Sequence, residues 1–159
     1  MSVDRTAEWE SLRAEHLQED RPASTARGLH HFALLSSDVE QTIGFYQGLL
    51  GFPLTELFEN RDYPGSTHFF FDVGHGNLLA FFDFPGLDVG PYVEVLGGLH
   101  HMAISMEPER WQEIVARFDD AGIDYVIHSE VSVYFTDPDG ARIELIADPL
   151  GEMYGEQVL

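Results

Sequence analysis

The fold of this chain is decided by a seven-residue stretch, GLHHFAL at residues 28–34, which returns as GLHHMAI at residues 98–104. The two stretches lie 70 residues apart, since 98 − 28 = 70. A repeat of this length indicates two copies of one supersecondary unit. A histidine at the same position in both copies puts two equivalent imidazoles at the junction of the units, and paired imidazoles suggest a metal.

The first copy reads as one strand, one helix and three further strands. Asp38 lies in a capping-box pattern that starts the helix, and Gly51 ends it. Turn-forming glycines and a proline separate the later apolar runs. The predicted strands are residues 29–35, 54–58, 67–73 and 77–84.

The second copy repeats this order. Its helix begins at Pro108, carries apolar residues at helical spacing and stops at Gly122. The turn signature DPDG at residues 137–140 joins the last two strands. The predicted strands are residues 99–106, 125–128, 132–136 and 141–147. The fold class is therefore α+β, built from two βαβββ modules.

Four segments follow from this reading of the chain. Residues 1–27 form a helical extension and linker, residues 28–97 the first module, residues 98–149 the second module, and residues 150–159 a C-terminal tail. Apolar residues at helical spacing in the extension predict a short amphipathic helix that covers part of the core. We expect no chemistry from this extension.

Strand alternation separates the two histidines of each pair. His31 and His101 share a strand face with small residues, whereas the bulky apolar residues lie on the opposite face, which should pack on the helix. A small-residue face leaves room for a ligand. His30 and His100 are expected at the border of the sheet.

Glu144 is the candidate for a third ligand. Apolar neighbours flank it on the opposite strand face, so its carboxylate points toward the same cavity as His31 and His101, although a solvent-facing glutamate would show the same pattern. Two imidazoles and one carboxylate form the facial set suited to Fe(II), with about three coordination positions open.

These motifs together resemble the vicinal oxygen chelate superfamily, which contains glyoxalase I, bleomycin resistance proteins, fosfomycin resistance enzymes and extradiol dioxygenases. The resemblance covers about residues 28–148 and rests on HFAL at 31–34, FYQGLLGF at 45–52, HMAI at 101–104 and YFTDPDGARIE at 134–144. It implies paired modules that curl their sheets around one metal cleft. It also implies a divalent ion on His31, His101 and Glu144, with Fe(II) favoured and Mn, Ni or Zn as alternatives.

The family's fourth ligand position falls on alanine. Aligning Gly76 with Gly140 places Ala80 opposite Glu144, and alanine cannot bind a metal. Asp83 lies on the opposite strand face and would need a bulge to substitute. The resemblance then favours three-ligand members over glyoxalase-type isomerases, and it implies proton-transfer and orienting roles for Tyr134 and His128.

We therefore expect an extradiol-type dioxygenase that acts on a small aromatic or enediol-like substrate. A glyoxalase-like lyase or isomerase is the alternative, together with proteins of the fosfomycin- and bleomycin-resistance types. Clustered phenylalanines in the late strands of the first module suggest a flat, apolar substrate. Because many members of the resembled family pair two chains to cover exposed sheet edges, we expect a homodimer.

Composition excludes several other classes. The chain has no cysteine and no lysine, so it offers neither a thiolate nucleophile nor a side-chain Schiff base. The formal net charge of −20 repels nucleic acid and anionic lipid. No apolar run approaches the roughly 20 residues that span a bilayer, and the first residues lack the pattern of a signal peptide. The expected compartment is the cytoplasm, with neither nucleic acid nor membrane as a partner.

Overall fold

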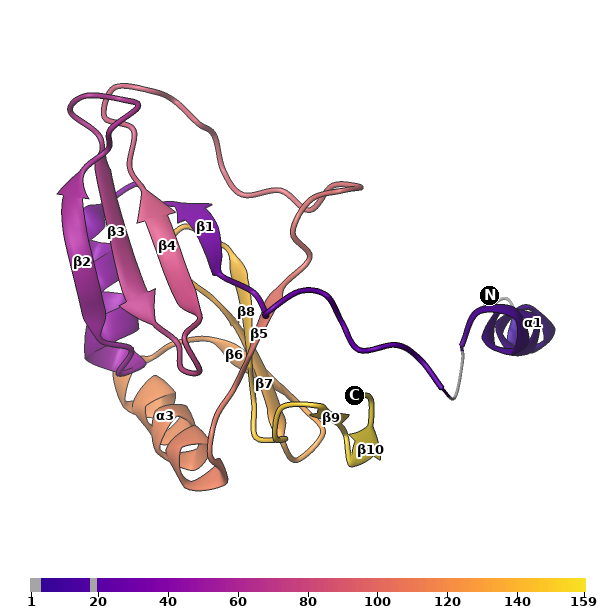
Figure 1. Cartoon of the computed structure of the whole chain (residues 1–159). Coiled ribbons are helices and arrows are strands. Elements are labelled where there is room, and N and C mark those ends of the chain that lie inside the picture. The colour runs from indigo at the N-terminus through magenta and orange to yellow at the C-terminus, as the bar shows by residue number, and fades with distance from the viewer. Residues whose placement is uncertain (1–3, 18–19) are drawn as a thin grey trace.

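The computed structural model describes residues 4–17 and 20–159 of the chain and contains both predicted modules (Figure 1). In the first module, Asp38 caps the helix by accepting a 3.0 Å hydrogen bond from the backbone N–H of Gln41. The elements of this module are β1 (His31–Leu35), α2 (Val39–Ile43), the π-helical turn η1 (Gly44–Leu49), β2 (Leu54–Glu59), β3 (Thr67–Asp72) and β4 (Leu78–Phe82).

The second module has the same order with a longer regular helix. Gly122 ends that helix in the left-handed conformation, with a φ of 67°, which glycine adopts without steric cost. Its elements are β5 (Met102–Ser105), α3 (Pro108–Ala121), β6 (Tyr125–His128), β7 (Ser132–Thr136) and β8 (Arg142–Ile146). The prediction of two βαβββ-like units is confirmed.

The two four-stranded mixed sheets have equivalent topologies and registers. Their strand orders are β1-β4-β3-β2 and β5-β8-β7-β6, and in each the first strand pairs in parallel with the last. Ala33 pairs with Ala80 in the first sheet, and Ala103 pairs with Glu144 in the second. Because Ala33 and Ala103 are equivalent in the repeat, Ala80 occupies the position of Glu144, as the sequence alignment predicts.

The modules share one hydrophobic core on the helix side of their sheets. The rings of Phe45 and Phe135 lie 6.0 Å apart across the module junction. At the same junction, the fully buried Tyr46 donates a 2.9 Å hydrogen bond to Oδ2 of Asp137. The π-helical turn holds Tyr46 there, because the N–H of Leu50 bonds to the carbonyl of Phe45, five residues back.

The two faces of β1 differ in burial, as predicted. Phe32 and Leu34 pack against the shared core, whereas His31, Ala33 and Leu35 are exposed on the other face. The shared core therefore joins the modules by their apolar faces and leaves the histidine-bearing face of β1 outside it.

The N-terminal helix α1 (Thr6–His16) corrects one expectation. The predicted helix is present, but none of its residues is buried, and it lies away from both modules at the end of an extended linker (Figure 1). The expected packing of this helix against the core is therefore wrong for the single chain. The predicted tail contains a short hairpin of β9 (Glu152–Met153) and β10 (Glu156–Gln157).

Removing the hydroxyl of Tyr46 should destabilise the junction of the modules. Tyr46→Phe leaves the buried Oδ2 of Asp137 without its side-chain donor, so we expect the free energy of unfolding to fall by about 1–3 kcal/mol. Urea denaturation followed by circular dichroism measures this change. An unchanged transition midpoint would show that the hydrogen bond adds nothing to the junction.

Candidate metal and substrate site

The second module brings four of the predicted site residues together. Nε2 of His101 lies 3.1 Å from Oε2 of Glu144, and the side chain of Glu144 is only 4% exposed. The ring of Tyr134 lies 5.4 Å from that of His101 and 5.3 Å from that of His128. These side chains come from β6, β7, β8 and the residue before β5, so one sheet face positions them all.

The His101–Glu144 pair fits two neighbouring ligands of one divalent ion. Two ligands that bind one ion at right angles, at about 2.1–2.2 Å, lie about 3.0 Å apart. The Nδ1 atom of His101 is engaged elsewhere, 2.6 Å from Nδ1 of His100, which leaves Nε2 for an ion. His101 and Glu144 therefore fit two of the ligands of the metal that the fold implies.

Glu144 is also held by a residue that the sequence did not single out. The hydroxyl of the fully buried Ser132 donates a hydrogen bond to Oε1 of Glu144. Such a bond orients the carboxylate and leaves its other oxygen, Oε2, facing His101. No sequence signal distinguishes Ser132, because a serine in a strand has no recognisable spacing to the carboxylate.

His31 has the same local geometry in the first module. Its Nδ1 atom lies 2.8 Å from Nδ1 of His30, which repeats the arrangement of His100 and His101. Its ring lies 6.4 Å from that of Phe70. Within residues 4–17 and 20–159, however, no group of three or more histidine, cysteine or acidic side chains could hold a metal ion. In the single chain, His31 therefore does not join His101 and Glu144.

Tyr134 has the most perturbed environment of the predicted residues. Burial raises the pKa of Tyr134, and the Glu144 carboxylate and the Tyr154 hydroxyl raise it further. The guanidinium of Arg142 lies over the ring, 5.0 Å from its centroid. The hydroxyl therefore stays protonated at neutral pH and can donate a hydrogen bond.

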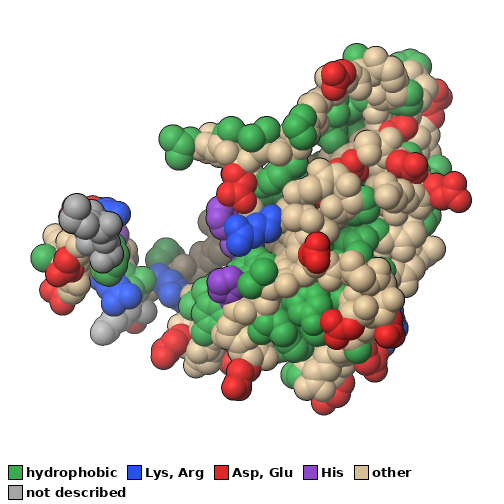
Figure 2. Space-filling view, turned by 180° about the vertical axis from the view of Figure 1, so that it is seen from behind, with side chains coloured by type: hydrophobic (Ala, Val, Ile, Leu, Met, Phe, Trp, Pro, Cys, Tyr) green, Lys and Arg blue, Asp and Glu red, His purple; other side chains and the backbone are tan. Residues whose placement is uncertain are grey.

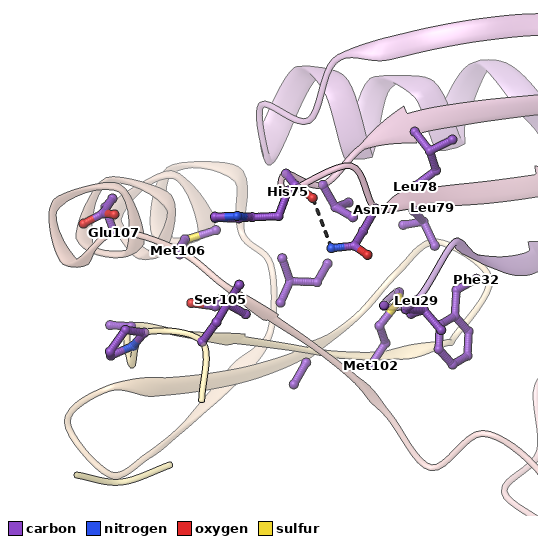
Figure 3. Close-up of a pocket in the computed structure, with 18 of the residues that line it drawn as sticks. Leu29, Phe32, His75, Asn77, Leu78, Leu79, Met102, Ser105, Met106 and Glu107 are labelled. Carbon is purple, nitrogen blue, oxygen red and sulfur yellow. Dashed lines mark hydrogen bonds between the residues drawn. The ribbon is translucent and has the colours of Figure 1, made fainter. Parts of the chain in front are cut away.

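Two hollows lie near the sheets, and one of them borders these side chains. One, of about 590 Å³, is lined by His128, Tyr134 and Arg142 and opens to solvent. Figure 2 shows histidine and arginine side chains next to one another on one face of the molecule, below a projecting loop that carries apolar side chains. The other hollow is apolar, measures about 730 Å³, and lies on the helix side of β1 and β5 against Phe32 and Met102 (Figure 3). The larger hollow contains neither His31 nor Glu144.

Asp83 does not compensate for Ala80. Its carboxylate accepts a hydrogen bond from the backbone N–H of Thr67 at the end of the first sheet. The first module therefore has no carboxylate at the position that is equivalent to Glu144. It offers only His31 as a candidate ligand, whereas the second module offers His101 and Glu144.

Comparisons with known proteins agree with this architecture. The sequence profile of the Glyoxalase/Bleomycin resistance protein/Dioxygenase superfamily matches residues 28–145. The chain belongs to this superfamily. It is 28% identical over 142 residues to the Bacillus subtilis protein named "Putative ring-cleaving dioxygenase MhqA", a match that covers 80% of this chain and 42% of that protein. The chain thus spans less than half the length of the curated relatives it matches.

Solved structures of this superfamily have the same fold. The fosfomycin resistance protein FosX from Listeria monocytogenes superposes with a TM-score of 0.60 at 23% identity, covering 80% of this chain and 96% of that one. A glyoxylase/bleomycin resistance protein/dioxygenase domain from Frankia superposes with a TM-score of 0.67 at 16% identity, with the same coverage. FosX has also been crystallised with Mn(II). In the described part of this chain, no helix is long and apolar enough to cross a membrane.

Proposed function

We propose that this protein is a metal-dependent, extradiol-type dioxygenase that cleaves a small aromatic or enediol-like substrate. The observation that carries the proposal is that Ala80 occupies the position in β4 that Glu144 occupies in β8. One carboxylate and two imidazoles leave about three coordination positions for substrate and dioxygen. The likeness to three ring-cleaving dioxygenases of Bacillus subtilis, each so named with the word "putative", supports the same class.

His31, His101 and Glu144 would hold the ion, with Fe(II) favoured and Mn, Ni or Zn as alternatives. When bound, such an ion brings substrate and dioxygen together and carries charge between them. Dioxygen is the oxidant, and both of its atoms enter the product as the ring carbon–carbon bond breaks. The reaction therefore needs no external reductant.

Tyr134 and His128 would act on the substrate from the second module. Tyr134 keeps its proton at neutral pH, so it can donate a hydrogen bond to a substrate oxygen and orient the ring. His128 packs edge-on against Tyr134 and is exposed to solvent, which suits a group that takes up and releases the substrate proton. Arg142 lies over the Tyr134 ring, with its Nη1 atom 3.7 Å from Oε1 of Glu94.

We propose further that the site is completed by a second copy of the chain. His31 lies on β1 and His101 beside β5, and both strands are edges of their sheets. Unpaired edges are ready to pair with another chain. Leu35 and Phe58, on the same face as His31, are 44% and 45% exposed, so a partner there would bury apolar surface. In a symmetric dimer, each site would combine His31 of one protomer with His101 and Glu144 of the other.

The function is tested by metal analysis and oxygen uptake. Protein purified without chelators should carry a divalent ion, and anaerobic loading with Fe(II) should produce oxygen uptake with at least one catechol or hydroquinone. Loading with Mn(II), Ni(II) and Zn(II) in parallel identifies the metal that supports turnover. If Fe(II) binds but no ring substrate consumes oxygen, the dioxygenase proposal fails.

A further inference from the structure

The outer face of the first sheet carries one histidine with a hydrogen-bonding atom that nothing in the described chain satisfies. His68 lies on β3, where its ring stacks on Phe82 at 3.8 Å and lies 4.2 Å from Phe70. Its Nε2 atom is buried and has no hydrogen-bond partner. A buried polar group without a partner costs about 1–3 kcal/mol. Such a group is expected to find its partner in whatever binds over it.

The repeat explains why this nitrogen is free. His68 pairs with Phe82 in β4, and Ser132, at the equivalent place in β7, pairs with Ile146 in β8. In the second module, Ser132 donates its hydrogen bond to Glu144, its diagonal neighbour. In the first module the diagonal neighbour is Ala80, which has no polar atom. A hydrogen-bonding side chain thus remains at a position where the chain supplies it with no partner.

His68 also lies on the face that the proposed site uses. Strand pairing places His31, Ala80 and His68 on the same face of the first sheet, with Phe70 between the two histidines. Phe58 packs edge-on against His68 at 5.4 Å and is 45% exposed, so a ligand that reaches Nε2 from solvent would displace this ring. This arrangement combines flat apolar surfaces with one hydrogen-bonding nitrogen.

We infer that His68 binds a ring hydroxyl of the substrate through Nε2 while the aromatic ring packs against Phe70. The inference rests on the proposed function and adds a residue that selects for a polar substituent. Burial lowers the pKa of His68, and the nearby His31 lowers it further. A neutral imidazole has one donor and one acceptor nitrogen, so it can bond to a hydroxyl without a net charge in the apolar site.

The test uses two substitutions with opposite expectations. His68→Phe fits the aromatic cluster and removes the unpaired nitrogen, so thermal unfolding should shift to higher temperature. The same variant should bind catechol about five- to tenfold more weakly, because one hydrogen bond is lost. His68→Gln places an amide nitrogen near the position of Nε2 and should keep most of the affinity. Calorimetry with catechol and the Zn(II)-loaded protein measures these affinities without turnover.

Nitrogen-15 NMR of the imidazoles provides a second measurement. The imidazole resonance that is absent from the spectrum of His68→Phe is assigned to His68. In the Zn(II)-loaded wild type, this resonance should shift when catechol is added. The control is His75→Asn, at an exposed turn residue with a φ of 51° that asparagine tolerates. This control should bind catechol like the wild type.

The outcomes separate this inference from the proposed function. If wild type and His68→Phe bind catechol equally and consume oxygen equally, His68 is only a packing residue and the dioxygenase proposal stands. An unmoved His68 signal at saturating catechol would also overturn the inference. If the metal-loaded wild type binds no catechol at all, both the proposed function and the role of His68 are overturned.

Discussion

Ala80→Glu is expected to abolish most oxygen uptake by the metal-loaded protein while it tightens the binding of the metal. The substitution restores a carboxylate at the position that is equivalent to Glu144, where it would fill one of the coordination positions that substrate and dioxygen need. We expect the rate of oxygen uptake to fall by about tenfold or more. Oxygen-electrode rates and metal titrations of both proteins measure the two effects.

The burial of Ala80 calls for a size control. Ala80 is fully buried, so any larger side chain strains the sheet, and a carboxylate there also loses hydration unless a metal pairs with it. Ala80→Leu matches the added bulk without a ligand atom. Metal should stabilise Ala80→Glu against thermal unfolding more than it stabilises Ala80→Leu. Equal stabilisation of the two variants would mean that residue 80 does not face the metal.

The same variant separates dioxygenase from isomerase chemistry. A glyoxalase-like enzyme would gain or keep activity in Ala80→Glu, because the new carboxylate supplies the missing ligand and base. Assays of thiohemiacetal isomerisation beside oxygen uptake distinguish these cases. Isomerase activity in the unmodified protein, without oxygen consumption on any catechol, would contradict the proposed function.

Mixing two inactive variants should restore activity if two copies share each site. His31→Ala and Glu144→Ala each destroy both sites of a homodimer, but a mixed dimer keeps one intact site out of two. Because half of randomly formed dimers are mixed, we expect about a quarter of the wild-type rate. Light scattering should give twice the 17.9 kDa mass of the chain, and oxygen uptake after subunit exchange measures the recovery.

A matched pair of variants controls this experiment. His101 and Glu144 come from the same module, so a mixture of His101→Ala and Glu144→Ala should remain inactive. Recovery in this control would mean that the His101 and the Glu144 of one site come from different protomers. If no mixture recovers and the protein remains monomeric at micromolar concentration, the shared site is wrong.

Most of the fold could be predicted because the repeat and the alternation of apolar residues are local signals. The strands Tyr125–His128 and Ser132–Thr136 lie at the predicted bounds, and the alignment of Ala80 with Glu144 agrees with the observed register. The π-helical turn around Tyr46 could not be predicted, because the spacing of its apolar residues also suits an α-helix.

The relative placement of the two modules depends on long-range packing that alternation does not encode. Alternation predicts which face of β1 is apolar, but it does not specify whether the histidine faces of two modules meet within one chain or between chains. The free nitrogen of His68 was missed for a related reason. Its lack of a partner depends on Ala80 and on the surrounding rings, which come together only in the folded sheet.

The most direct test of the central claim is the fate of dioxygen. Fe(II)-loaded wild type would be given ¹⁸O₂ with the ring substrate that supports oxygen uptake, and the product would be analysed by mass spectrometry. We predict a ring-opened product that carries two ¹⁸O atoms. A product without ¹⁸O, or an intact ring after oxygen has been consumed, would contradict the assignment as an extradiol-type dioxygenase.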